Sequence, residues 1–171
     1  MRTLFLAALI SALSSPAYCA LDIVTTTEDL AALAREVGGK HVQVQSIAKG
    51  YQDPHFVDAK PSYLLKLKRA DLFIQVGLEL EVSWAPNLLR SARNKKIRPG
   101  ARGFLDASAG CEVLDKNAAA DRSQGDVHPE GNPHYWLDPA NGRIIAGNIK
   151  DRLVRLDPEN TADYEENLKA F

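Results

Sequence analysis

Cysteine is scarce in this sequence, with Cys19 and Cys111 the only two among 171 residues. If Cys19 leaves with an N-terminal leader, Cys111 has no partner for an intramolecular disulfide. A disulfide framework is therefore excluded as the source of stability. We expect Cys111 to fill space in the fold rather than to serve as a reactive thiol.

An excess of either charge is also lacking. The chain has 21 lysines and arginines against 22 aspartates and glutamates, for a formal net charge of -1. This balance gives no electrostatic argument for nucleic acid or an anionic membrane as a partner. The remaining composition is that of an ordinary soluble protein, and the length is sufficient for one domain with its own core.

Long hydrophobic runs are absent, since the longest, residues 4–13, is too short to span a bilayer. It follows a short basic start and precedes small residues at 14–20. This order predicts a secretory signal peptide over residues 1–20, cleaved after Cys19, with Ala17 or Ala20 as alternatives. Tyr18 argues against a lipoprotein site. A buried N-terminal helix is the competing interpretation.

The familiar catalytic motifs are missing as well. The sequence contains no phosphate-binding loop, dinucleotide-binding glycine pattern, His-Glu-x-x-His or Gly-x-Ser-x-Gly. No serine or cysteine is evidently paired with a histidine. We therefore assign no catalytic residue and expect that the chain is not an enzyme.

Hydrophobic periodicity predicts an alternation of strands and helices. The expected strands are 21–26, 41–48, 71–77 and 104–108, and the expected helices are 28–37, 61–69, 81–92, 140–156 and one that starts at 157–160. Thr27 is expected to cap the first helix. The alternation predicts an α/β fold, a doubly wound parallel sheet with helices on both faces. Ligands of such sheets bind beyond the carboxyl ends of the strands.

Two histidines follow a proline in a loop, in Asp53-Pro54-His55 and in Asn132-Pro133-His134. Proline restricts the backbone, so less entropy is lost when the histidine is fixed. Neutral imidazole is a good ligand for zinc and other first-row metals. The two histidines are 79 residues apart, so only the fold can bring them together. Taken alone, each histidine could equally be a polar residue in a turn with no metal to bind.

Three further residues are weaker candidates, and the remaining histidine is not one. His128 precedes the second of these histidines by six residues and is either a third nitrogen ligand or a solvated loop residue. Glu79 and Glu81 follow the third expected strand and are either auxiliary oxygen ligands or the solvated start of a helix. His41 opens a strand after two glycines and a lysine, and we expect it to be a solvated surface residue.

The residues after the second Pro-His pair have structural explanations. Asp138 and Pro139 are expected to cap and start the next helix, rather than to bind metal. Tyr135 and Trp136 are expected to pack. Trp136 and Leu137 are expected to anchor the loop in the core.

Several segments together resemble the solute-binding proteins of bacterial zinc and manganese ABC transporters, a family that includes streptococcal adhesins. The matching segments are LDIVTTTEDLAALAREVGG, DPHFVDAKPSYLLKLKRADLFIQVGLELE, GNPHYWLDPANGRIIAGNI and LDPENTADYEENLKAF. The resemblance implies that His55 and His134 bind the metal. It also implies two α/β lobes joined by a long helix, with the second lobe supplying a histidine or glutamate and an aspartate.

The resemblance divides the chain into a signal peptide at 1–20, an N-terminal metal-binding lobe at 21–156 and the start of the inter-lobe helix at 157–171. The second lobe is absent from the sequence, so we expect a truncated chain. Two histidines supply half of a tetrahedral shell. We therefore expect weak metal binding unless water, Glu79, His128 or a second chain completes it. A histidine-rich loop is missing, because residues 116–130 contain only His128.

The function implied is that of a periplasmic component that captures zinc, or alternatively manganese, for an ABC permease in the inner membrane. Three nitrogen donors would favour zinc and more oxygen donors would suit manganese. A metallohydrolase would need a general base beside an open coordination position, and no such base is evident. An adhesive or partner-binding surface protein built on the same lobe is the remaining alternative.

Overall fold

The computed structural model describes residues 20–116 and 128–171, and its sheet has four parallel strands in the order β2-β1-β3-β4. The strands are β1 (Leu21–Thr25), β2 (Val42–Ser46), β3 (Leu72–Gln75) and β4 (Phe104–Asp106). All three pairings between neighbouring strands are parallel. The predicted parallel α/β sheet is confirmed, with each strand shorter than expected by one to three residues. The expected signal peptide at 1–20 lies almost entirely outside the described residues.

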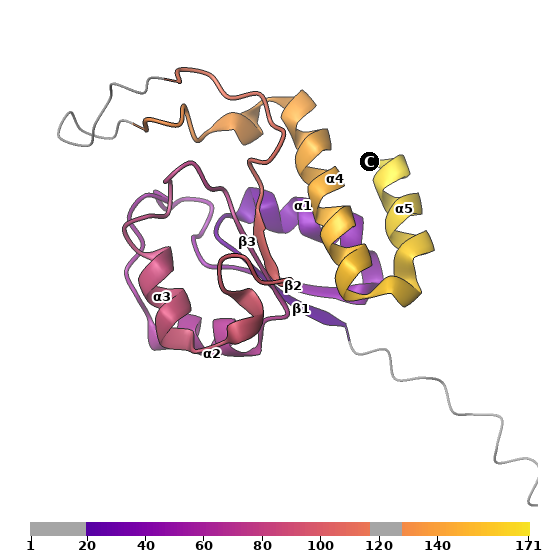
Figure 1. Cartoon of the computed structure of the whole chain (residues 1–171), viewed down its shortest axis with the longest axis horizontal. Coiled ribbons are helices and arrows are strands. Elements are labelled where there is room, and N and C mark those ends of the chain that lie inside the picture. Colours follow the sequence, from indigo (N-terminus) through magenta and orange to yellow (C-terminus); the bar gives the residue numbers. More distant parts are fainter. Residues whose placement is uncertain (1–19, 117–127) are drawn as a thin grey trace, which may run out of the picture.

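Helices cover both faces of this sheet (Figure 1). The α-helices are α1 (Glu28–Gly38), α2 (Pro61–Arg69), α3 (Ala85–Ala92), α4 (Pro139–Leu156) and α5 (Thr161–Ala170). Short 3-10 segments are η1 (Gly39–His41), η2 (Lys95–Ile97), η4 (Tyr135–Leu137) and η5 (Pro158–Asn160). Helices α1, α4 and α5 contact one another, whereas α2 contacts α3. None of the helices in the described ranges is both long and apolar enough to cross a membrane.

The strands feed two separate cores because successive side chains of a strand point to opposite faces. In β3, Leu72 and Ile74 join the core beneath α1, α4 and α5, and Phe73 joins the core beneath α2 and α3. In β1, Ile23 and Val24 divide in the same way. This double burial explains why β3 reads as a continuous apolar run in the sequence.

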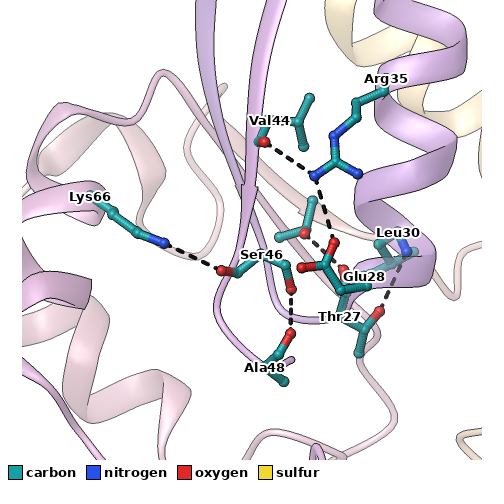
Figure 2. A network of polar contacts seen from close by, with 9 residues as sticks. Thr27, Glu28, Leu30, Arg35, Val44, Ser46, Ala48 and Lys66 are labelled. Atoms are coloured by element: carbon teal, nitrogen blue, oxygen red, sulfur yellow. Dashed lines mark hydrogen bonds and ion pairs between the residues drawn. The ribbon is translucent and has the colours of Figure 1, made fainter. Parts of the chain in front are cut away.

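Polar contacts fix the ends of β2 and the start of α1 (Figure 2). Thr27 caps α1 as predicted, because its Oγ1 accepts from the Leu30 N–H at 3.4 Å. The Ser46 hydroxyl donates to the Ala48 carbonyl at 2.7 Å, and the Lys66 ammonium lies 3.5 Å from the Ser46 carbonyl. Burial, together with the charge of Lys49, lowers the pKa of Lys66. The Lys66 contact joins the end of β2 to α2, and the Arg35 guanidinium of α1 donates to the Val44 carbonyl of β2 at 3.3 Å.

Helix α3 starts later than the sequence predicts. Residues 81–84 form turns, and the regular helix begins at Ala85. The expected start at 81 was wrong because Glu81 is buried and its carboxylate binds backbone groups after β3 rather than facing solvent.

His41 is not the solvated residue that its position after two glycines suggested. Its side chain is 6% exposed, and its Nε2 lies 2.6 Å from the Asp163 carboxylate in α5. Its ring meets the Tyr164 ring edge to face, with centroids 5.7 Å apart. The expectation was wrong because α5 covers η1. The neighbouring Lys40 also pairs with Asp163, and these contacts lower the pKa of that exposed carboxyl.

We expect Tyr164→Phe to lower the free energy of unfolding by about 1 to 2 kcal/mol. The ring of Tyr164 is fully buried, and its hydroxyl donates to the Asp157 carboxylate at 2.6 Å. Phenylalanine keeps the packing but leaves the carboxylate without this donor. Urea unfolding should show a lower midpoint for this variant and an unchanged one for Tyr51→Phe, because Tyr51 is 89% exposed.

Candidate metal centre

The candidate residues lie at the carboxyl ends of the strands. In the strand order β2-β1-β3-β4, β2 lies on one side of β1 and β3 lies on the other. The loops that follow β1 and β3 therefore lead in opposite directions from the carboxyl ends of these two neighbouring strands. Ligands of doubly wound sheets bind at such a switch point. The His55 loop follows β2, residues 76–84 follow β3, and the segment with His134 leads into α4, which begins at the upper end of the view in Figure 1.

The residue before each proline fixes the backbone of the histidine that follows. Asp53 Oδ1 accepts from the His55 N–H at 2.9 Å, and Asn132 Oδ1 accepts from the His134 N–H at 3.0 Å. Aspartate and asparagine side chains often accept a hydrogen bond from the backbone N–H two residues later in the chain. The two loops therefore contain the same type of turn, each with a proline between the side-chain acceptor and the histidine.

The Asp53 carboxylate also selects the tautomer of His55. Its Oδ1 lies 2.7 Å from Nδ1 of the ring, and the bonds from His55 lower the pKa of Asp53. An ionised carboxylate only accepts, so Nδ1 carries the hydrogen and Nε2 carries a lone pair. This is the arrangement in which a histidine presents Nε2 to a metal while a carboxylate orients the ring.

The start of α3 braces the His55 loop from behind. The Trp84 indole N–H donates to the Pro54 carbonyl at 2.9 Å, and the Ser83 hydroxyl donates to the His55 carbonyl at 2.7 Å. Trp84 is buried, so the proline is held against a fixed ring. This support has no signal in the sequence, because no local pattern links residues about 30 positions apart.

The His134 segment is anchored by Tyr135. The Tyr135 hydroxyl donates to the Val76 carbonyl at 2.7 Å, and its ring is buried. Trp136 packs against the core and lies 5.0 Å from the His134 ring, between centroids. Packing by Tyr135 and Trp136 is confirmed. The expectation that Leu137 anchors the loop was wrong, because it is 73% exposed.

Helix α4 begins as predicted. The Asp138 side chain accepts from the Ala140 N–H at 2.8 Å, and Pro139 is the first residue of the helix. The interpretation of Asp138 as a cap is confirmed. This cap fixes the direction in which the chain leaves His134.

His128 is much closer to His55 than its place in a polar loop suggested. It is 8% exposed, and its Nδ1 lies 3.0 Å from the Leu78 carbonyl oxygen, to which it must donate. Its Nε2 then carries a lone pair and lies 3.2 Å from Nε2 of His55. The expectation of a solvated loop residue was wrong for His128 itself. Residues 117–127 of that loop lie outside the described ranges.

The spacing of these two nitrogens suits a shared cation. Two nitrogens that each lie about 2.05 Å from one tetrahedral zinc ion are about 3.3 Å apart. Two lone pairs repel, so only a proton or a metal ion between them makes the 3.2 Å separation of His55 and His128 favourable. The His134 ring lies 5.5 Å from the His55 ring, between centroids.

The electrostatics of His134 favour its neutral form. Burial lowers the pKa of His134, and the neighbouring His55 and His128 lower it further. A neutral ring is the form that binds metal. Within residues 20–116 and 128–171, no group of three His, Cys, Asp or Glu side chains is arranged to hold an ion by itself. The described part of the chain therefore presents three neighbouring imidazoles and an incomplete coordination shell.

The two glutamates after β3 have different surroundings. Glu79 is exposed, and it and Leu78 have positive φ angles of 65° and 50°, a conformation that non-glycine residues rarely adopt. Glu81 is 3% exposed and accepts from the Thr26 hydroxyl at 2.6 Å. It also accepts from two backbone N–H groups, and burial raises its pKa. Glu81 is thus a structural carboxylate that ties the end of β1 to the end of β3.

Comparison with known proteins gives one family match and many relatives. Residues 23–171 match the profile of the family described as zinc-uptake complex component A, periplasmic. The manganese ABC transporter substrate-binding lipoprotein scaA of Streptococcus gordonii is 32% identical, over 88% of this chain and 46% of the relative. The iron ABC transporter substrate-binding lipoprotein MtsA of Streptococcus pyogenes serotype M1 is 30% identical over the same shares.

The fold has a similar partial match among solved structures. A zinc-bound deletion mutant of ZnuA superposes with a TM-score of 0.73 and 28% identity, covering 89% of this chain and 53% of that one. The chain thus spans about half the length of the curated relatives and solved structures that it matches. The expected correspondence to one half of a two-lobed protein agrees with this coverage.

Proposed function

Because the chain belongs to the zinc-uptake complex component A family of periplasmic proteins, we propose that it captures a divalent metal ion for an ABC uptake system. Within that proposal, residues 21–156 form the metal-binding lobe and residues 157–171 begin the helix towards a second lobe. The chain delivers the ion to a permease in the inner membrane, and no bond is made or broken. The comparisons do not favour the adhesin alternative.

The ligands we propose are His55 and His134, with His128 as the third nitrogen. The observation that carries this proposal is the 3.2 Å contact between Nε2 of His55 and Nε2 of His128, whose Nδ1 atoms are both engaged elsewhere. The His134 ring lies beside this pair, with its centroid 5.5 Å from that of His55. Glu79 stays a candidate for an auxiliary oxygen ligand, since its loop carries the carbonyl that orients His128.

Zinc is the metal we propose, with manganese as the alternative. Three imidazole nitrogens suit zinc, whereas manganese prefers more oxygen ligands. The relatives differ in this respect, because their names specify manganese for one and iron for another, and the similar solved structure contains zinc. Ligands from a second lobe would shift the balance between these metals.

The place of action we propose is the periplasm. The N-terminal pattern at 1–20 supports export, and the two relatives are named as lipoproteins of ABC transporters. The cleavage position after Cys19 or Ala20 stays a prediction. No nucleic acid is expected as a partner.

Thermal unfolding in the presence of metal ions tests this function. A ligand that binds only the folded state at a hundred times its Kd stabilises the fold by about 2.7 kcal/mol. We expect zinc to raise the Tm of the chain, manganese to raise it less, and magnesium to leave it unchanged, because magnesium prefers oxygen ligands. A Tm that none of the transition metals changes would contradict the proposal.

Acidification should weaken zinc binding. Each imidazole must be neutral to bind, and ordinary histidine has a pKa near 6.5. Because burial lowers the pKa of His134 below this value, its protonation competes with zinc only at lower pH. We expect the affinity to be nearly constant above about pH 7 and to fall below about pH 6.5. Calorimetric titration between pH 5 and 8 measures this, and the fall should be less steep in His134→Ala.

A further inference from the structure

The near-zero net charge conceals a strongly basic segment. Residues 90–102 contain six cations and no carboxylate, although the whole chain has a formal charge of -1. All six side chains are exposed. They are Arg90, Arg93, Lys95, Lys96, Arg98 and Arg102, which together we call the basic edge.

The topology gathers these cations at the amino-terminal ends of the strands. Helices that connect parallel strands run back across the sheet, so α2 and α3 end where β3 and β4 begin. Asn94 joins the two helix ends, because its side chain donates to the carbonyls of Leu67 and Ala70 at 2.9 and 2.7 Å. This places the exposed Lys68 and Arg69 beside the basic edge, which increases its positive charge.

Intramolecular contacts account for only part of this charge. Lys96 pairs with Asp71 at 2.8 Å, and the pair raises the pKa of Lys96. The Arg102 side chain donates to a carbonyl at the end of α4. Cations near helix ends also interact favourably with the helix dipole. By contrast, the side chains of Arg93, Lys95 and Arg98 have no ion pair within the described ranges. Arg93 follows the last residue of α3 and can interact with its dipole, but η2 is too short for a dipole to explain Lys95 and Arg98.

The basic edge adjoins the point where the chain enters the sheet. Leu21, the first residue of β1, lines the same surface hollow as Lys95, Lys96 and Arg102. Residues that precede β1 therefore attach to the lobe at this edge. The three histidines lie at the opposite end of the sheet, beyond the carboxyl ends of the strands. In Figure 1 the start of β1 is at the lower end of the view and the start of α4 at the upper end.

We propose that the basic edge binds the surface of anionic phospholipid membranes. Exposed lysines and arginines that face such a surface each add to its attraction, and the attraction declines within a Debye length. Leu21, where the chain enters the sheet, lies at this same edge, so a membrane-inserted segment before the lobe would hold these cations near the lipid headgroups. The histidines then face the aqueous side, where metal ions are captured.

A single-stranded nucleic acid is the less favoured anionic partner. Proteins that bind single strands combine positive charge with aromatic rings on which bases stack. Residues 90–102 contain no aromatic residue. The exposed charge therefore suits a broad anionic surface better than a stack of bases.

Vesicle co-sedimentation of the full chain tests this proposal. The variant Arg93→Gln/Lys95→Gln/Arg98→Gln removes three exposed cations from the basic edge. Lys49→Gln/Arg143→Gln/Lys169→Gln is the matched control, because it removes three exposed cations elsewhere on the lobe. Its net charge and its N-terminal residues are therefore the same as those of the basic-edge variant. Vesicles of equal parts phosphatidylglycerol and phosphatidylcholine are compared with vesicles of phosphatidylcholine alone.

We expect the chain to bind the anionic vesicles more strongly than the neutral ones. The basic-edge variant should bind the anionic vesicles about a hundredfold less strongly, and the control should differ little from the unmodified chain. Raising the salt from 0.1 M to 1 M should remove the preference, because the Debye length falls from about 10 Å to about 3 Å. Unchanged zinc response and Tm in the variant show that the fold is intact.

Three results would overturn the proposal. One is equal binding of the two variants to anionic vesicles. Another is equal binding of the chain to anionic and neutral vesicles. The third is retention of an oligonucleotide, but not of vesicles, through the basic edge. Each leaves the proposed metal capture untouched, because that function is measured separately by the zinc response.

Discussion

Replacing His55 and His134 together with alanine is expected to abolish the stabilisation of the chain by zinc. Both histidines are held by turns in which the preceding Asp53 or Asn132 accepts from the histidine N–H. Their removal leaves one imidazole, His128, at the site. Loss of even an orienting partner typically costs about 10- to 100-fold in metal affinity, so we expect loss of two ligands to cost well over a hundredfold. Isothermal titration with zinc, alongside thermal unfolding, measures the change.

His41→Gln is the matched control for this experiment. It removes a histidine that pairs with Asp163, far from the three neighbouring imidazoles. Its own Tm should be lower, because a buried ring is replaced, but the rise in Tm caused by zinc should persist. Nanomolar zinc binding that survives the double substitution would refute the assignment of His55 and His134.

Replacing Glu81 with alanine is expected to lower the free energy of unfolding by about 3 to 5 kcal/mol, because each buried donor left without an acceptor costs about 1 to 3 kcal/mol. The carboxylate is 3% exposed and accepts from the Thr26 hydroxyl and from the N–H groups of Val76 and Gly77. Alanine leaves all three donors without this acceptor and opens a cavity between β1 and β3. Urea unfolding followed by circular dichroism measures the loss.

Glu81→Gln separates the hydrogen bonds from the charge. Glutamine has nearly the same shape and keeps one acceptor oxygen, so we expect a smaller loss of about 1 to 3 kcal/mol. An exposed substitution nearby, Glu79→Gln, should change the free energy of unfolding little. Equal urea midpoints for Glu81→Ala and the unmodified chain would show that Glu81 does not tie β1 to β3.

The sheet could be predicted because its strands have strong local signals. β3 is apolar throughout since both of its faces are buried, and β1 is rich in β-branched residues for the same reason. The caps at Thr27 and Asp138 could be predicted because capping needs only neighbouring residues. The start of α3 could not be predicted from the sequence. Glu81 fits the helical pattern, but its side chain binds Thr26 and the backbone after β3, and the helix begins only at Ala85.

The histidines show the same division between local and long-range causes. The turns at His55 and His134 depend on adjacent residues, and the repeated Pro-His pattern makes them visible in the sequence. The contact between His55 and His128 joins residues 73 positions apart, so no local pattern reveals it. The burial of His41 likewise depends on α5, which follows it by 120 residues.

The most direct test of the metal-capture proposal is a crystal structure of the chain with zinc, with anomalous scattering recorded at the zinc edge. The proposal predicts one strong peak within about 2.0–2.1 Å of a ring nitrogen of His55 and of His134. Nε2 of His128 should lie in the same coordination shell. A zinc ion bound away from both His55 and His134 would contradict the account.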